Sequence, residues 1–179
     1  MDINRKISES LIHLIQKYSF TEITVAMLCR EAGISRTCFY KHYNNTAEVL
    51  DAVLEQIFSQ VTTVQTQLLC GETSSGVPLC SYVRAYPELQ NLFIDDTILH
   101  SVLHKFVEYK KEEYLAAMRK RYNADEDSLL ALLYFQLNGC IHVIRHMRGR
   151  SDEEWEATRR TIDTFIKNGY NHLRPAGGR

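Results

Sequence analysis

The first part of the chain places apolar residues at the three- and four-residue spacing of amphipathic α-helices. One helix is predicted near the N-terminus, with an apolar face formed by Ile7, Leu11, Leu14, Ile15 and Tyr18. A second helix has inner positions Val25, Leu28, Cys29 and Ala32. Thr24 is the expected cap of this second helix. Gly33 then suits the left-handed residue that ends a helix, and Ser35 suits the cap of the next one.

Two more helices are predicted before the first turn-rich stretch. The third is short, from about residue 36 to 43, and the polar run Asn44-Asn45-Thr46 separates it from a long fourth helix. We expect Thr46 to cap this fourth helix. Its apolar positions are Val49, Val53, Leu54, Ile57, Val61, Val64 and Leu68. Residues 70–80 are rich in Gly, Ser and Thr and are interpreted as a linker.

The rest of the chain also predicts helices. Residues 81–96 suggest one or two short helices interrupted at Pro87. Longer helices are expected at about 98–121, 125–147 and 152–172. Ser151 and Glu154 give the last of these the pattern of a capping box. The helix at 125–147 is apolar nearly all round in its first half, so we expect it to be buried by its own core and by a second surface.

Glycine and proline are scarce where a β-fold would need turns. Gly33 is the only glycine in residues 1–70, and residues 88–174 contain no proline. Because sheets need turn residues at short intervals, this composition excludes most all-β and α/β folds. The length of 179 residues corresponds to slightly more than one average domain, and we expect an all-α protein.

The whole chain is nearly neutral, but the segment around the predicted third helix is not. There are 21 Lys and Arg against 22 Asp and Glu, so the net charge of −1 gives no bulk attraction to a polyanion. Residues 32–47 nevertheless contain no Asp or Glu and carry Arg36, Lys41 and His42. Two short helices joined by a glycine turn form a helix-turn-helix, here about residues 24–43, whose second helix can lie in the DNA major groove. The alternative is a plain helix connection with a solvated polar face.

The spacing assigns roles to the side chains of the short third helix. Its outward face is expected to carry Arg36, Thr37, Tyr40 and Lys41, while Phe39 and Cys38 turn towards the core. Arg36 is suited to guanine and Thr37 to a thymine methyl group. Tyr40, Lys41 and His42 are suited to phosphate, as are the free amides at Thr46. The full candidate DNA-binding set is Thr24, Ser35, Arg36, Thr37, Tyr40, Lys41, His42, Tyr43 and Thr46.

These residues resemble the N-terminal domain of the TetR/AcrR family of bacterial transcriptional regulators. The likeness covers roughly residues 4–62 and rests on Thr24-Val25, Ala32-Gly33-Ile34-Ser35, Phe39-Tyr40-Lys41-His42-Tyr43 and Ala47-Glu48-Val49-Leu50. It implies a DNA-binding domain of three helices in residues 1–62. It also implies a larger helical domain in residues 63–179 that dimerises and usually binds an effector. Family members usually repress, so the resemblance implies a repressor that a small molecule releases from DNA.

The sequence departs from the family pattern at two positions. Tyr43 stands where Phe is common, which is a conservative change. Thr46 stands where Lys commonly opens the fourth helix and resembles a phosphate contact. A hydroxyl and a backbone amide then replace a full charge, so we expect DNA binding with a shallower salt dependence than the family norm.

The resemblance also implies a homodimer. The helices at about 125–147 and 152–172 would pair with their counterparts in a second chain to form a four-helix bundle. The nearly all-apolar stretch of the first of these helices favours such a partner independently. A dimer sets two recognition helices on successive major grooves and predicts a palindromic operator. The alternative is a helix buried wholly within one chain.

Aromatic residues and histidines suggest two ligand sites in the larger domain. A pocket for an apolar or aromatic effector is expected to use Phe93, Phe106, Tyr109, Met118 and Tyr134. His100 and His104, like His142 and His146, are four residues apart and could share a metal on one helix face. This metal-sensing reading is a minority hypothesis, and the principal expectation is that the protein has no cofactor and no metal.

The five cysteines, Cys29, Cys38, Cys70, Cys80 and Cys140, are odd in number and lack paired CxxC spacing. They indicate reduced thiols in a cytoplasmic protein. Cys70 and Cys80 flank the linker and could form a redox pair, and Cys38 could sense oxidation. The N-terminus has no apolar core of a secretory signal, and the longest apolar run, Leu129–Phe135, is far too short to span a bilayer.

No enzyme is expected. The chain contains no nucleophile elbow, no zinc-protease motif, no P-loop and no dinucleotide-binding glycine fingerprint. The acidic pairs Asp95-Asp96 and Glu112-Glu113 lie in polar stretches and do not suggest paired acid–base chemistry. The alternative function is a helical protein of the same fold that acts through a protein partner as a co-regulator.

Overall fold

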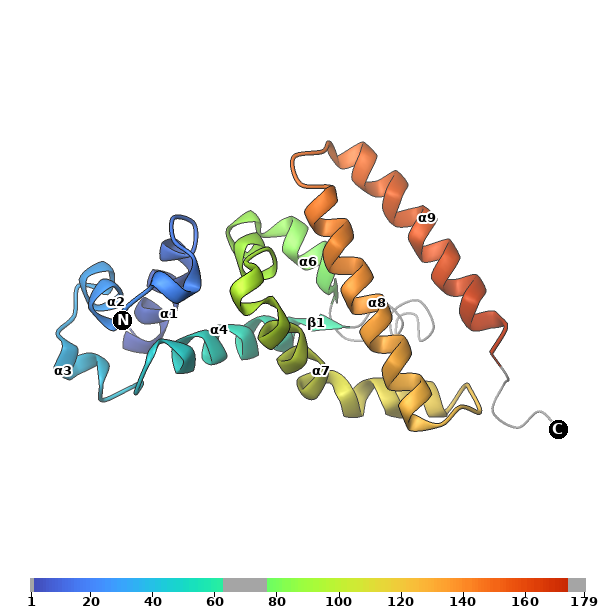
Figure 1. The fold of residues 1–179 in the computed structure, drawn as a ribbon, viewed down its shortest axis with the longest axis horizontal. Helices are drawn as coiled ribbons and strands as arrows, with labels where there is room; N and C mark the ends of the chain where they lie inside the picture. The colour runs from blue at the N-terminus through green and yellow to red at the C-terminus, as the bar shows by residue number, and fades with distance from the viewer. Residues whose placement is uncertain (1, 63–76, 174–179) are drawn as a thin grey trace. The chain divides into compact units, whose positions relative to one another are not determined.

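The computed structural model describes residues 2–62 and 77–173, and the fold is all-α apart from one very short pair of strands. Its α-helices are α1 (Ile3–Leu14), α2 (Val25–Ala32), α3 (Arg36–Phe39), α4 (Thr46–Gln60), α6 (Leu79–Ala85), α7 (Asp96–Arg119), α8 (Glu126–His146) and α9 (Asp152–Asn171) (Figure 1). Two 3-10 helices, η1 (Phe20–Glu22) and η3 (Pro87–Phe93), complete the helical elements of these residues. The strands β1 (Val61–Thr62) and β2 (Val77–Pro78) pair in parallel.

Packing divides the chain into two units. The first unit consists of Met1–Ser59 and Tyr86–Lys105, and the second consists of Gln60–Ala85 and Phe106–Arg179. The helix-turn-helix segment thus shares its unit with η3 and the first turns of α7. The functional boundary expected after residue 62 stays a prediction.

The core of the first unit is built from the apolar faces predicted for its helices. Ile7 and Leu11 of α1 and Leu28 of α2 are fully buried. The segment 86–105 is tied to α1 and η1 by hydrogen bonds: Asn91 Nδ2 donates to the Ile15 carbonyl (2.9 Å) and the Phe20 amide donates to Asp95 Oδ2 (2.8 Å). These bonds join parts of the chain that are far apart in sequence.

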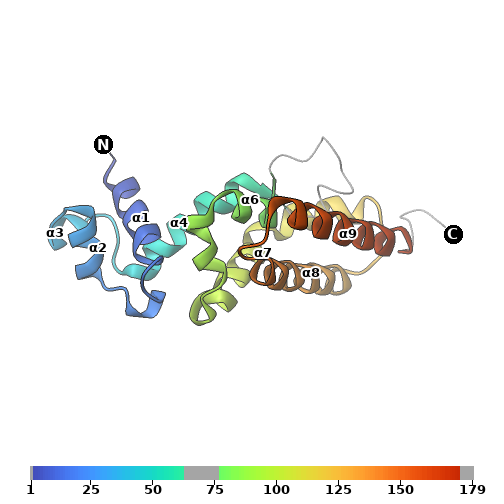
Figure 2. The ribbon, with the colours of Figure 1, turned by 90° about the horizontal axis from the view of Figure 1, so that it is seen from above.

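In the second unit, α8 and α9 form an antiparallel hairpin, and both views show the two helices side by side (Figures 1 and 2). The predicted capping box is confirmed at the start of α9, where Ser151 Oγ accepts from the Glu154 amide (3.2 Å) and Glu154 Oε2 accepts from the Ser151 amide (2.9 Å). The buried Tyr114 hydroxyl of α7 donates to the Leu129 carbonyl (3.0 Å) and lies 3.2 Å from the Tyr170 hydroxyl. A single polar network therefore joins α7, α8 and α9.

Arg84 of α6 fastens the turn between α8 and α9. Its Nη2 donates to the Arg150 carbonyl (2.8 Å) and to Asp152 Oδ1 (2.7 Å). The guanidinium also lies 5.7 Å from the centroid of the Trp155 ring. Because α8 ends just before this turn, Arg84 supplies positive charge where the carbonyl groups of a helix end need it.

Three predictions about where helices end are wrong. The third helix, expected to run to about residue 43, ends at Phe39, and residues 40–42 form a turn. Tyr18 is 44% exposed, because α1 ends at Leu14 and the apolar spacing continues beyond the helix. The fourth helix ends at Gln60, and Val61 pairs with Val77 in a strand, which periodicity alone does not reveal. The further apolar positions Val64 and Leu68 lie outside the described residues.

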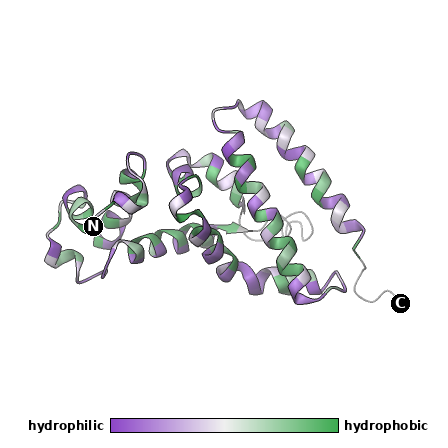
Figure 3. Cartoon of the chain, viewed as in Figure 1, coloured by the Kyte–Doolittle hydropathy of each residue, from purple (hydrophilic) through white to green (hydrophobic). Residues whose placement is uncertain are grey.

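The structure confirms one half of the prediction for α8, its burial by the core of its own chain, and the second surface stays a prediction. Leu129, Leu133, Leu137, Ile141 and Ile144 are buried and form its inner face. Only 28% of its most apolar 18-residue window is buried, although the helix is apolar along most of its length (Figure 3). By length and composition alone, α8 is also the one described helix that could cross a membrane. Its other face thus carries apolar surface that the described residues leave uncovered.

Candidate nucleic-acid interface

The helix-turn-helix is shaped by three local backbone features. Thr24 Oγ1 accepts a hydrogen bond from the Met27 amide (3.3 Å), which confirms it as the cap of α2. Gly33 ends α2 with φ at 64°, a left-handed conformation that favours glycine. Ser35 Oγ then accepts from the Cys38 amide (3.1 Å), which confirms it as the cap of α3. These three features set the direction in which α3 leaves α2.

A single aromatic side chain anchors α3 to the core. Phe39 is completely buried, as predicted, and its ring packs edge-to-face against Tyr40 at 5.5 Å between centroids. Its ring also meets that of Tyr43 at 6.0 Å. Tyr40 remains 55% exposed, while Cys38 is half-buried. With only four residues in α3, this anchor and the Ser35 cap hold most of the helix in place.

The predicted outward face is exposed in the structure. Thr24, Ser35, Arg36, Thr37, Tyr40, Lys41 and His42 are exposed, and Tyr43 and Thr46 are half-buried. Arg36 and Lys41 have no acidic partner among the residues that the structure describes. Both cations therefore remain available to an external anion. Their contacts with DNA stay a prediction.

The cap of α4 differs from the prediction. Asn45 Oδ1, and not the Thr46 hydroxyl, accepts from the Glu48 amide (2.9 Å), so Thr46 is the first residue of the helix. The Glu48 carboxylate in turn accepts from the Asn44 amide (2.8 Å) and from Asn44 Nδ2 (2.9 Å). Both Asn45 and Thr46 are residue types that cap helices well. The hydrogen bonds of Glu48 favour Asn45 as the cap, one position before the predicted Thr46. Glu48, three positions after Asn45, was the sequence signal that could have identified Asn45 as the cap.

Glu48 is the acidic residue that follows the acid-free segment. Hydrogen bonds from the Asn44 backbone amide and side-chain amide lower the pKa of its carboxyl group. Glu48 is therefore firmly ionised near neutral pH. Its negative charge lies beside the first turn of α4, where Thr46 and Ala47 present amides that have no acceptor within the helix.

The residues predicted for an effector pocket do not line either of two hollows in the structure. Phe93, Phe106 and Met118 are buried in the cores, whereas Tyr109 and Tyr134 are exposed. A polar groove of about 450 Å³ lies along α1 and α2, and a small cavity of about 20 Å³ lies among α6, α8 and α9. Neither includes any of the five residues. The effector pocket therefore stays a prediction.

The histidine pairs do not form a larger ligand cluster. His100 and His104 belong to the first unit and His142 and His146 to the second, and all four are exposed. Within residues 2–62 and 77–173, no group of three or more His, Cys, Asp or Glu side chains is arranged to hold a metal ion.

The cysteines present a pair that the sequence did not suggest. Cys70 lies outside the described residues, so the expected pairing with Cys80 is not visible. Cys80 instead has Cys140 as its hydrogen-bond partner. Cys29, Cys38, Cys80 and Cys140 are all free thiols. The two partners are distant in sequence, and no local motif marks them.

Comparison with known proteins gives a likeness of fold. No protein-family model matches the sequence, and no curated protein does so. A solved structure, "Dihydroxyacetone kinase operon activator DhaS", matches with a TM-score of 0.52 and 17% sequence identity, covering 92% of this chain and 95% of that chain. At this identity the match speaks for the fold alone. This chain therefore shares an all-helical fold with an operon activator over nearly its whole length.

Proposed function

We propose that the protein is a DNA-binding regulator of transcription of the TetR/AcrR type, in which α3 reads the major groove. The observation that carries the proposal is the exposed surface of α3 and the turn after it. It carries Arg36 and Lys41, neither of which has an acidic partner among the described residues, and residues 32–47 contain no acid. The Ser35 cap and the buried Phe39 hold α3 in a fixed position, which a helix that contacts base edges requires. The fold shared with an operon activator supports the same class of function.

Binding to DNA from upstream of the protein's own gene tests this proposal. In a mobility-shift titration, the double variant Arg36→Ala, Tyr40→Ala is expected to bind specific DNA about 10–100-fold more weakly, because it loses a base contact and a phosphate contact. Arg148→Ala is the control, since it removes an exposed positive charge from the second unit. Undiminished specific binding by the double variant contradicts the assignment of the reading face. Absence of specific binding by the wild-type protein favours the co-regulator alternative.

The second part of the proposal is a homodimer through α8 and α9. Phe135 of α8 and Phe165 of α9 are each 70% exposed, which is unusual for a large apolar side chain with no partner. Gly139 lies between them in sequence on the exposed side of α8, and a Cβ added there meets nothing within 4 Å. Among the described residues, no packing therefore requires a glycine here, and its missing side chain would let another helix approach closely.

Sedimentation of the wild-type protein is expected to give a dimer at micromolar concentration. Phe135→Asp with Phe165→Asp is expected to give a monomer, because two charges would enter the apolar contact. Tyr18→Asp is the matched control, since it changes an exposed aromatic residue of the first unit and is expected to leave the dimer intact. A wild-type monomer at this concentration contradicts the proposal.

The third part concerns the direction of regulation. We infer repression in the cytoplasm, released by a small-molecule effector, from the resemblance to the TetR/AcrR family. The matching solved structure is named an operon activator, so whether this protein represses or activates requires its own test. A promoter fusion read with and without the protein decides it: higher expression without the protein supports repression, and lower expression overturns it.

A further inference from the structure

Two thiols from different helices meet inside the second unit. Cys80 lies in α6 and Cys140 in α8, and the two thiols are hydrogen-bond partners although neither belongs to a disulfide. The helices α6 and α8 themselves pack against each other. Both cysteines line the same small cavity, so a disulfide between them would have only a short distance to close.

The pair borders a small cavity with mixed walls. The cavity is about 20 Å³ and is lined by the two cysteines and by Val143, Trp155, Arg159, Ile162 and Asp163. Such a volume accommodates one molecule of about the size of water. Cys80 is only 8% exposed, whereas Arg159 and Asp163, which also line the cavity, have side chains that are 35% and 22% exposed.

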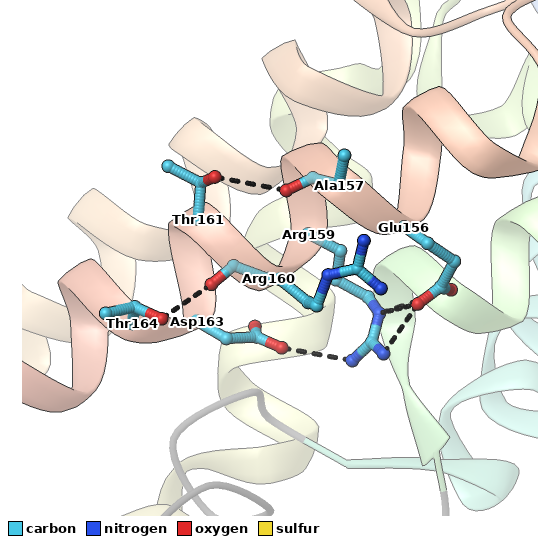
Figure 4. A network of polar contacts seen from close by, with 7 residues as sticks. All are labelled: Glu156, Ala157, Arg159, Arg160, Thr161, Asp163 and Thr164. Atoms are coloured by element: carbon cyan, nitrogen blue, oxygen red, sulfur yellow. Dashed lines mark hydrogen bonds and ion pairs between the residues drawn. The ribbon is translucent and has the colours of Figure 1, made fainter.

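Arg159 brings a fixed positive charge to this cavity. It donates to Glu156 (2.8 Å) and to Asp163 Oδ2 (3.0 Å), and Figure 4 shows it bridging these two carboxylates along α9. Arg159 and the Cys80 sulfur interact electrostatically. A thiolate in the cavity therefore faces both a cation and the carboxylate of Asp163.

The two sulfur atoms have unequal chemistry. The thiol of Cys140 donates to the Cys80 sulfur and lowers the pKa of Cys80 despite its burial. The same bond, together with burial, raises the pKa of Cys140. Arg159 lines the cavity and interacts electrostatically with Cys80, and the thiolate is the nucleophile, so Cys80 is the sulfur suited to attack first and Cys140 the one suited to react second.

We propose that Cys80 and Cys140 are a redox site, at which hydrogen peroxide converts the two thiols into a reversible disulfide between α6 and α8. The Cys80 thiolate attacks one peroxide oxygen, the O–O bond breaks, and hydroxide leaves as water with the proton released by Cys80. Cys80 is then a sulfenic acid. The Cys140 sulfur attacks the Cys80 sulfur, the S–O bond breaks, and the Cys140 proton leaves in a second water. One peroxide is thus reduced to two waters as two thiols lose two electrons.

The test treats reduced full-length protein with hydrogen peroxide, blocks remaining thiols with N-ethylmaleimide and maps peptides by mass spectrometry without reduction. A Cys80–Cys140 linked peptide that disappears with dithiothreitol is expected. The oxidised protein is also expected to melt about 5–10 °C higher, because a long loop is closed. A Cys70–Cys80 link, oxidation that stops at separate cysteines, or full alkylation of both thiols overturns the proposal.

Three variants make the outcome specific. Cys140→Ser is expected to leave Cys80 as a sulfenic acid that dimedone traps, whereas Cys80→Ser is expected to leave Cys140 unoxidised. Cys38→Ser is the control and is expected to form the Cys80–Cys140 link like the wild-type protein. Dimedone labelling of Cys140 in the Cys80→Ser variant contradicts the assigned order of attack. These readouts are covalent, so their failure is independent of whether the protein binds DNA.

Discussion

The contribution of Arg84 to the stability of the turn between α8 and α9 can be measured. Replacing it with Met keeps most of the aliphatic stem and removes every hydrogen bond of the guanidinium. A charge-assisted bond to the Arg150 carbonyl contributes about 1.5–3 kcal/mol, while the contact with the Trp155 ring contributes about 0.5–1 kcal/mol. The bond to Asp152 contributes little, because the Asp152 side chain is 95% exposed and the pair is screened by water.

We therefore expect Arg84→Met to lower the free energy of unfolding by about 2–3 kcal/mol and the melting midpoint by about 5–10 °C. Trp155 is the single tryptophan of the chain, so its fluorescence in a urea titration reports on this cluster. Asp152→Asn is the matched control and is expected to cost less than about 0.5 kcal/mol. Equal losses for the two variants would refute the reasoning, since the exposed ion pair would then carry the stabilisation.

Three other outcomes follow from the described geometry. Gly33→Ala is expected to destabilise the protein by about 1–2 kcal/mol. The cause is backbone strain alone, since no atom lies within 4 Å of the new Cβ. Gly169→Ala, which is also unobstructed but lies inside α9, is expected to stabilise the protein in thermal melts. Thr46→Lys is expected to steepen the salt dependence of operator binding by about one unit of slope, and identical slopes in a salt titration contradict this. Tyr114→Phe is expected to cost about 1–2 kcal/mol in urea titrations, because the buried Leu129 carbonyl loses its donor; an unchanged midpoint argues against the network.

The helices and most of their ends could be predicted from the sequence because their signals are local. Thr24, Ser35 and Ser151 each form their bond with an amide three residues away, within reach of a single turn. Gly33 adopts the left-handed conformation by itself. The cap of α4 was misplaced by one residue because two adjacent side chains could serve, and the choice depends on the bonds of Glu48.

The remaining features depend on contacts between distant parts of the chain. Nothing near Val61 in sequence indicates that Val77 ends its helix by forming a strand. The pairing of Cys80 with Cys140 and the attachment of Asn91 to the end of α1 are likewise long-range. The exposure of the residues around Phe39 was predictable from their spacing, since Phe39 takes the core-facing position, although the helix expected at about 36–43 ends at Phe39.

The carboxylate of Glu48 has a consequence for how the proposed regulator would search a chromosome. This carboxylate already accepts the hydrogen bond of the Asn44 backbone amide, a donor that could otherwise bind a DNA phosphate. If DNA binds here as proposed, its phosphate would have to compete with this carboxylate for the Asn44 amide, and the remaining backbone amides for phosphate near the start of α4 would be those of Thr46 and Ala47. Weak binding to phosphates shortens the residence time of a protein on non-specific DNA. The protein would then sample many sites quickly and dwell only where α3 finds its bases.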